Sequence, residues 1–459
     1  MTSLLLPDRG QPARTIHVVD PAGHDGWLAA QPPRSRTALA AQGFKPTAGA
    51  HAILPGDGPE DWSALAIVAD AAKLTPWCLA RAAEALPAGS YRLSGASAGA
   101  AMLGWLLAQH RFNRYRKREG QAARVLLCDE PGRIEAVARI ADATARVRDL
   151  VDTGASDLGP AELEAEAQGL CDAFGGTLSV TRGDALAQGY PMIHTVGQAA
   201  GREPRLIEVR WGDPAHPRVA IVGKGVCFDS GGLDIKPSAG MRLMKKDMGG
   251  AAHALALARL AMAAQLPVRL HLLIPAVENA IAGNAFRPGD VMRSRAGLFV
   301  ENTNTDAEGR LILGDALTRA GEEAPELILD FATLTGAARV ALGPDLPAMF
   351  ASDDALAAQL VACGNTEADP LWHMPLWDGY DEMLRSDVAD LCNAPEGGMA
   401  GAITAALFLR RFVPAGTPWA HLDTFAWRPA AKPGRPKGGE AYGLRAAWAL
   451  LEARYPRRG

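Results

Sequence analysis

The feature that most constrains the fold is an alternation of strand-like and helix-like segments in the second half of the chain. Short runs rich in Leu and β-branched residues lie at 218–228, 268–274 and 326–331. Helical runs lie between and beside them, at 250–264, which is rich in Ala, and at 308–319. Strands and helices in alternation are typical of a largely parallel sheet covered by helices. This part of the chain is therefore predicted to form an α/β domain.

The first third of the chain shows a weaker alternation of the same kind. Short apolar runs at 51–54 and 64–68 accompany segments with helical periodicity at 75–86 and 98–112. This pattern predicts a separate α/β domain at the amino terminus.

A segment rich in Ala, Arg and Asp separates these two regions. Residues 132–151 contain no Pro, and no Gly after the first position, as is typical of an exposed helix that joins two domains. The sequence therefore predicts three parts: an N-terminal α/β domain at 1–131, the linker helix with the start of the second domain at 132–155, and the rest of the second domain at 156–459.

The composition excludes several classes of protein. The 459 residues are 48% hydrophobic and 21% charged, which is typical of a globular protein with a large core and not of a disordered chain. A formal net charge of −4 argues against a nucleic-acid partner. Six scattered cysteines without a C-x-x-C pair favour a reducing compartment. Because we find neither a signal peptide nor a membrane span in the sequence, we expect a cytoplasmic protein.

Three short motifs point to other functions with less specificity. Residues 95–99 match the G-x-S-x-G turn of serine hydrolases, with Ser97 as the nucleophile, but such pentads are common in Ala-rich chains. Basic residues at 111–118 and 428–437 could hold phosphate, although such runs are more often solvated loops and helix ends. Lys224 lies between two glycines but lacks the other residues of a nucleotide-binding P-loop.

A further set of charged residues lies within or beside apolar segments, where an unpaired charge is costly. Two of them end a strand-like run and others precede predicted helices, so all are expected at one edge of the sheet. Carboxylates gathered there repel one another unless cations neutralise them, and oxygen-rich sites suit Mn²⁺, Mg²⁺ or Zn²⁺. A surface network of salt bridges is the alternative. The residues are Lys224, Asp229, Lys236, Asp247, Asp306 and Glu308.

The segments around these residues resemble the leucyl aminopeptidase family of cytosolic di-metal aminopeptidases. The matching blocks are 223–232 (GKGVCFDSGG), 235–237 (IKP), 244–252 (MKKDMGGAA) and 304–313 (NTDAEGRLIL), in the order and spacing of that family. The resemblance extends from about residue 132 to the end of the chain and is faint before it. It implies a macro-like N-terminal α/β domain, joined by a helix to a C-terminal α/β catalytic domain with a mixed, largely parallel central sheet. It also implies a homohexamer.

The resemblance implies two divalent metal ions, Mn²⁺ or Zn²⁺. One ion would be held by Lys224, Asp229, Asp247 and Glu308, and the other by Asp229, Asp306 and Glu308. Two ions that share carboxylate ligands suit a two-metal hydrolase. The implied activity is removal of the first residue from a peptide with a free amino terminus, by a hydroxide that bridges the two metals.

The resemblance also implies two catalytic side chains and an anion. Lys236 would stabilise the oxyanion that forms during attack. Arg310 would hold a bicarbonate that acts as general base, with a backbone contact from Leu334; a simple salt bridge is the alternative for Arg310. Because some members of the family have other roles, a non-catalytic hexameric scaffold or a DNA-binding protein is the alternative function, although the complete set of metal ligands argues against it.

One departure from the family concerns the pocket for the first side chain of the substrate. Where the family continues after the strand at 419–423 with Ile-Ala-Gly, this chain has Phe425 in place of the small Ala. The other walls of the pocket would be Met244, Thr333 and Gly336. We therefore expect bulky N-terminal residues to be disfavoured, unless the strand shifts and Phe425 turns into the core.

Overall fold

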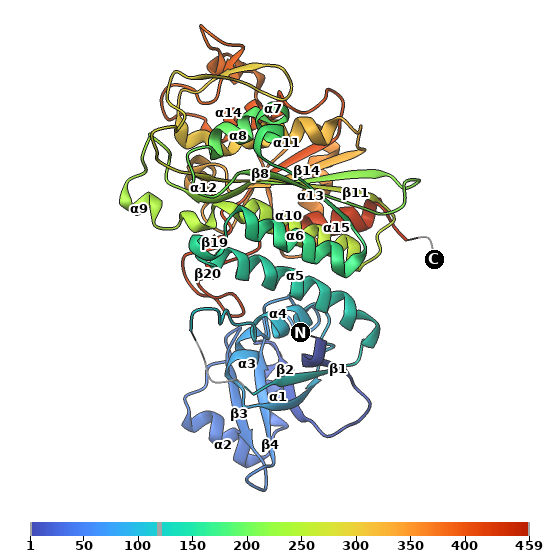
Figure 1. Ribbon diagram of the computed structural model, residues 1–459. Helices are drawn as coiled ribbons and strands as arrows, with labels where there is room; N and C mark the ends of the chain where they lie inside the picture. The colour runs from blue at the N-terminus through green and yellow to red at the C-terminus, as the bar shows by residue number, and fades with distance from the viewer. Residues whose placement is uncertain (1, 117–121, 458–459) are drawn as a thin grey trace. The chain divides into compact units, whose positions relative to one another are not determined.

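The computed structural model describes residues 2–116 and 122–457, and two positions of the basic run at 111–118, Lys117 and Arg118, lie outside them. Two compact units are present (Figure 1). The smaller contains Met1–Ala145 and Ala430–Lys437, and the larger contains Arg146–Pro429 and Gly438–Gly459. The division falls within helix α5 (Ile134–Asp152). In the described residues, we find no helix long and apolar enough to cross a membrane.

The smaller unit is built on a six-stranded sheet in the order β1-β6-β5-β2-β4-β3. All neighbouring strands are parallel except β3 and β4. Trp105 and Tyr91 are fully buried in its core. The strands are β1 (Leu5–Pro7), β2 (Arg14–Val19), β3 (His51–Pro55), β4 (Trp62–Ile67), β5 (Gly89–Ser94) and β6 (Arg124–Cys128). The helices are α1 (His24–Ala29), α2 (Pro33–Ala41), α3 (Ala80–Ala85) and α4 (Ala101–Leu107).

The larger unit is built on a nine-stranded mixed sheet in the order β16-β15-β18-β14-β9-β11-β8-β7, with β10 paired to β11. Its central strands β18, β14, β9 and β11 run parallel, and β8, β7 and β15 add antiparallel pairs. The strands are β7 (Thr177–Thr181), β8 (Arg205–Trp211), β9 (Arg218–Gly223), β10 (Gly225–Asp229), β11 (Arg269–Asn279), β14 (Leu327–Ala332), β15 (Ala348–Ala351), β16 (Trp372–His373) and β18 (Trp419–Asp423).

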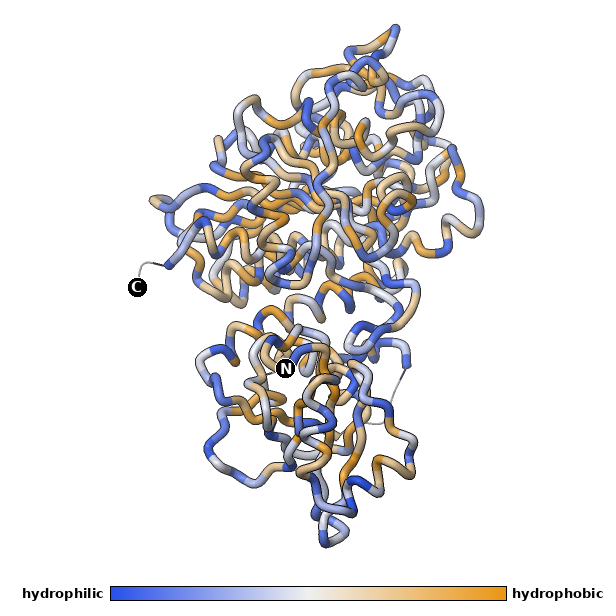
Figure 2. The backbone as a smooth tube through the Cα atoms, turned by 180° about the vertical axis from the view of Figure 1, so that it is seen from behind, coloured by the Kyte–Doolittle hydropathy of each residue, from blue (hydrophilic) through white to orange (hydrophobic). Residues whose placement is uncertain are grey.

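Helices cover both faces of this sheet, with α6, α10 and α15 on one side and α7, α8, α11 and α14 on the other (Figure 1). Every residue of β14 and β18 is buried, as is typical of central parallel strands covered on both faces, and most of these residues are apolar. Figure 2 shows apolar segments concentrated inside the unit. The helices are α6 (Pro160–Phe174), α7 (Gly183–Gly189), α8 (Pro191–Gly197), α9 (Ser238–Met241), α10 (Gly249–Ala263), α11 (Glu308–Gly321), α12 (Gly336–Leu342), α13 (Asp354–Thr366), α14 (Gly401–Arg410) and α15 (Leu444–Arg454). Three short strands form a separate sheet, β12 (Val291–Arg293), β13 (Phe299–Glu301) and β17 (Leu391–Cys392), and β19 (Trp427–Arg428) pairs with β20 (Gly438–Gly439).

The α/β class and the mixed, largely parallel sheet predicted for the second domain are confirmed. One detail differs, because the apolar run at 218–228 forms two strands that are interrupted at Lys224. Strand β9 pairs with both β14 and β11, whereas β10 pairs with β11 alone. At the interruption, the backbone N–H of Lys224 donates to Phe331 O at 2.9 Å and its carbonyl accepts from Ala251 N at 2.8 Å. The lysine is thus anchored between β14 and α10.

Candidate functional site

The charged residues singled out in the sequence meet at one edge of the larger sheet. Asp229 ends β10, Asp247 lies in the 3₁₀ turn before α10 and Glu308 begins α11. They line a cavity of about 470 Å³ together with Lys224 and Asp306. Both the metal-site and the salt-bridge interpretation of the sequence predict that these side chains lie together. The distances and pKa values of the side chains distinguish the two interpretations.

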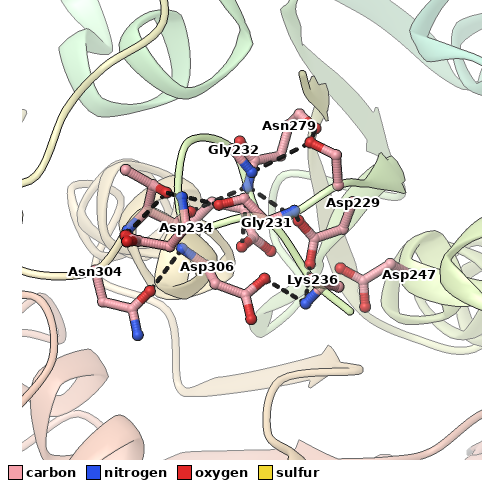
Figure 3. A network of polar contacts seen from close by, with 12 residues as sticks. Asp229, Gly231, Gly232, Asp234, Lys236, Asp247, Asn279, Asn304 and Asp306 are labelled. Carbon is pink, nitrogen blue, oxygen red and sulfur yellow. Dashed lines mark hydrogen bonds and ion pairs between the residues drawn. The ribbon is translucent and has the colours of Figure 1, made fainter. Parts of the chain in front are cut away.

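Three carboxylates form the tightest part of the cluster. One oxygen from each of Asp229, Asp306 and Glu308 lies within 4.8 Å of the other two. Lys236 reaches in from the following loop, with its Nζ 2.8 Å from Asp229 Oδ2 and in contact with Asp306 Oδ1 (Figure 3). Lys224 Nζ lies between a fourth acid and one of these three, at 2.7 Å from Asp247 Oδ2 and 2.9 Å from Glu308 Oε1.

Burial and neighbouring charges shift the pKa values of the acids in this cluster in different directions. Burial raises the pKa of Glu308 to about 8, and the charge of Asp229 adds to the shift. Burial and the charge of Asp229 also raise the pKa of Asp306 to about 6. Asp247 differs, because the charges of Lys224 and Lys246 outweigh its burial and lower its pKa to about 2. Protons thus remain on two carboxylates at a pH where exposed acids are ionised.

Two glycines allow the lysine to approach the carboxylates. A Cβ on Gly309 would lie 2.6 Å from Lys224 Nζ, and a Cβ on Gly250 would lie 2.2 Å from Phe331 O. Any larger side chain at either position would displace Lys224 or the first turn of a helix from the strand ends. These close contacts explain why the blocks that carry the acids also contain glycine.

Two residues hold the acids in place by hydrogen bonds that were not predicted from the sequence. Asn279, at the end of β11, donates from Nδ2 to Asp229 Oδ1 at 2.9 Å and to Thr305 O at 3.0 Å. Thr333 Oγ1, just after β14, donates to Asp247 Oδ1 at 2.8 Å. A polar residue just after the mostly apolar run at 272–277 was the available signal for Asn279.

Arg310 is buried in the first turn of α11. Its Nη1 donates to Asn393 O at 2.8 Å, while its buried Nε has no hydrogen-bond partner among the described residues. Burial lowers the pKa of Arg310 to about 10, so the side chain remains cationic at neutral pH. Leu334 lines the cavity, but its N–H already donates to Asp423 Oδ1 at 3.0 Å.

The alternative serine nucleophile lies in the smaller unit, where its surroundings do not suit it. Ser97 Oγ lies 3.0 Å from Asp129 Oδ1 and 2.9 Å from Glu130 Oε2, so carboxylates stand where a triad requires an imidazole. His421, the histidine that such a triad could have used, is 2.5 Å from Asp330 Oδ1 in the core of the larger unit.

Comparison with known families covers both units. Residues 145–448 match the sequence model of a protein family described as "Cytosol aminopeptidase family, catalytic domain". Residues 15–128 match the family model described as "M17 aminopeptidase, N-terminal domain". The chain belongs to the cytosol aminopeptidase family. It is a metallo-aminopeptidase, a hydrolase, and its resemblance to the leucyl aminopeptidases is confirmed.

Individual relatives agree with this family. A crystal structure of the cytosol aminopeptidase from Coxiella burnetii is 45% identical, with a TM-score of 0.94 over 98% of this chain and 99% of that one. A probable cytosol aminopeptidase of Syntrophotalea carbinolica is 42% identical over 76% of this chain and 73% of its own length. The bottromycin maturation enzyme BotP in complex with Mn is 32% identical, with a TM-score of 0.88 over 97% of this chain and 100% of that one.

The donors of the site fit the divalent ions on which cytosol aminopeptidases depend. Carboxylate oxygens converge from separate segments, and burial together with the charge of Asp229 favours the protonated forms of Asp306 and Glu308. A dication removes the reason for that protonation because it offsets the repulsion and competes with the protons. Asn279 Oδ1 is in addition a buried oxygen without a hydrogen-bond donor among the described residues. An ion-pair network alone does not explain this excess of acids.

Proposed function

We propose that this chain removes the first residue of peptides with the help of two divalent ions, Mn²⁺ or Zn²⁺. The observation that carries the proposal is the set of three carboxylates whose oxygens lie within 4.8 Å of one another beside a fourth acid and a buried lysine. The first ion would be held by Lys224, Asp229, Asp247 and Glu308. The second would be held by Asp229, Asp306 and Glu308.

When bound, the two ions would acidify a water molecule and polarise the scissile carbonyl. Lys236 would donate from Nζ to the oxyanion, since it already lies at the edge of the carboxylate cluster. Lys224 would bind as a neutral amine. Its pKa is raised now because the charges of Asp247 and Glu308 outweigh burial, and a dication in contact with those acids reverses that balance.

We extend the proposal to a bicarbonate general base at Arg310. The support is its unpartnered buried Nε, a donor aimed at no protein acceptor among the described residues. The anion would accept from this guanidinium and take a proton from the attacking water. A contact from the backbone of Leu334 would require its N–H to be shared with Asp423, its present acceptor.

The assembly and location are part of the same proposal. We infer a homohexamer in the cytoplasm, supported by the resemblance to the leucyl aminopeptidases and by relatives whose names describe cytosol aminopeptidases. The substrates would be peptides with a free amino terminus, whose amine binds beside the carboxylate cluster.

The deciding experiment removes and restores the metal. Protein stripped with a chelator should not cleave leucine amide, and Mn²⁺ or Zn²⁺ should restore cleavage. Asp229→Asn and Asp306→Asn should stay inactive with metal and keep the circular dichroism of the wild type, because these acids bind ions and do not form the core. Asp387→Asn, at an exposed acid outside the cavity, is the matched control and should be fully active.

Two results would overturn the proposal. Full activity in the metal-free protein would exclude a metal-dependent reaction. Loss of cleavage in Ser97→Ala, with Asp229→Asn still active, would assign the chemistry to the serine of the smaller unit.

A further inference from the structure

One wall of the cavity carries positive charge and an aromatic ring. Arg339 on α12 and Phe425, which follows β18, both line the cavity. The guanidinium carbon of Arg339 lies 4.8 Å from the centroid of the Phe425 ring, and Lys246 Nζ lies 5.4 Å from the same centroid. Two cations therefore meet at one aromatic ring, in the place where the sequence predicted a wall of the pocket for the first side chain.

Arg339 differs from the other cations of the cavity in having no counter-ion in the part of the chain that the structure describes. Lys246 Nζ lies 3.4 Å from Asp247 Oδ1, and Lys224 and Lys236 each contact two carboxylates. Among the described residues, no carboxylate lies within salt-bridge distance of Arg339.

The acids that line the cavity have partners other than Arg339. Four of them form the cluster proposed to hold the ions, namely Asp229, Asp247, Asp306 and Glu308. The fifth, Asp423, accepts from Thr335 Oγ1 at 2.6 Å and from the N–H of Leu334 at 3.0 Å. The wall formed by Phe425 and Arg339 therefore presents a positive charge that no described residue neutralises.

We propose that this pocket selects peptides whose first residue is acidic, with Arg339 binding the side-chain carboxylate of an N-terminal Glu or Asp. The inference rests on the proposed function, since an amine bound at the ions directs the first side chain into this pocket. A guanidinium pairs with a carboxylate through two parallel hydrogen bonds. The Phe425 ring holds the guanidinium by a cation–π contact, which reduces the entropy lost when the substrate binds. A first residue of Lys or Arg is repelled by the same charge.

The test compares substrates that differ only in charge. Glutamic acid α-amide and glutamine α-amide have nearly the same shape, so the ratio of their kcat/KM values isolates the carboxylate. In the Mn²⁺-loaded wild type we expect this ratio to favour Glu by about tenfold, the value of a charge-assisted hydrogen bond. Arg339→Gln should bring the ratio close to one, Arg339→Lys should retain most of it, and Arg339→Glu should favour a lysine amide over a glutamic acid amide. Inhibition by free glutamate should weaken in Arg339→Gln, and inhibition by free glutamine should not.

Arg242→Gln is the matched control, because Arg242 is an exposed arginine near the cavity in sequence that does not line it. This variant should leave the ratio unchanged. Normal cleavage of leucine amide with equal kcat/KM values for the Glu and Gln amides in the wild type would overturn the assignment of Arg339 alone. A ratio that persists in Arg339→Gln would also overturn it. No metal-dependent cleavage of any amide would overturn the proposed function and this inference together.

Discussion

At the scale of single residues, neighbouring groups determine how each charge behaves. Asp247 and Glu308 are both buried and both contact Lys224, yet the pKa of Asp247 is lowered to about 2 and that of Glu308 is raised to about 8. The difference arises because Lys246 adds a second positive charge beside Asp247, whereas Asp229 adds a negative charge beside Glu308. A cation that binds in this cluster is therefore attracted most strongly by Glu308 and Asp229, whose negative charges are less well neutralised than that of Asp247.

The role of Arg310 leads to a prediction at this scale. If Arg310 holds a general base, Arg310→Ala should lower kcat by about 10² to 10⁴, and added bicarbonate should stimulate the wild type more than the variant. Arg319→Ala is a control on the same helix, since Arg319 pairs with Glu208 and Glu322 away from the cavity. The measurement is the cleavage rate of the wild type and of Arg310→Ala at increasing bicarbonate concentrations. Equal stimulation of the two proteins would show that Arg310 does not hold the general base.

At the scale of elements, a buried pair connects two central strands of the larger unit. His421 on β18 lies 2.5 Å from Asp330 on β14, and Asp330 also accepts from Trp419 Nε1 at 2.7 Å. Burial alone lowers the pKa of His421, but the charge of Asp330 outweighs it and raises the pKa above the usual value. The protonated histidine therefore contributes to the cohesion of the sheet beneath the site.

This pair predicts a dependence of stability on pH. Because the folded pKa of His421 is raised, its stabilisation is fully present below the unfolded pKa of about 6.5 and is lost as the pH rises through the folded value. The free energy of unfolding should fall more steeply with rising pH in the wild type than in His421→Gln. Urea denaturation of the metal-free protein across this range measures both slopes, and parallel slopes would contradict the prediction.

At the scale of the whole molecule, all the proposed metal ligands belong to one of the two units. They lie between Lys224 and Glu308 in the larger unit, whereas the smaller unit has its own sheet and its own core. Ions held by donors from separate segments stabilise the native arrangement of those segments, because binding is linked to folding.

Hydrogen exchange can test this division between the units. Adding Mn²⁺ to the chelated protein should slow exchange in peptides from 225–252 and 304–321, and should leave peptides from β2 and β4 unchanged. The Asp306→Asn protein is the control and should show a much smaller effect. Equal slowing in both units would show that the ions do not act through the ligands proposed here.

The sequence by itself determined the α/β class and the presence of an N-terminal and a C-terminal domain, and it singled out the charged residues that the structure brings together. These features are readable because hydrophobic periodicity is local and because charges such as Asp229 and Glu308 stand out beside apolar runs. Only the tertiary structure decided which side chains surround them. Three features join segments that are far apart in the chain. They are the backbone hydrogen bonds of Lys224 where the strand is interrupted, the hydrogen bonds from Asn279, and the contact between Arg339 and Phe425. Such contacts depend on strand order and helix packing, which no local pattern encodes.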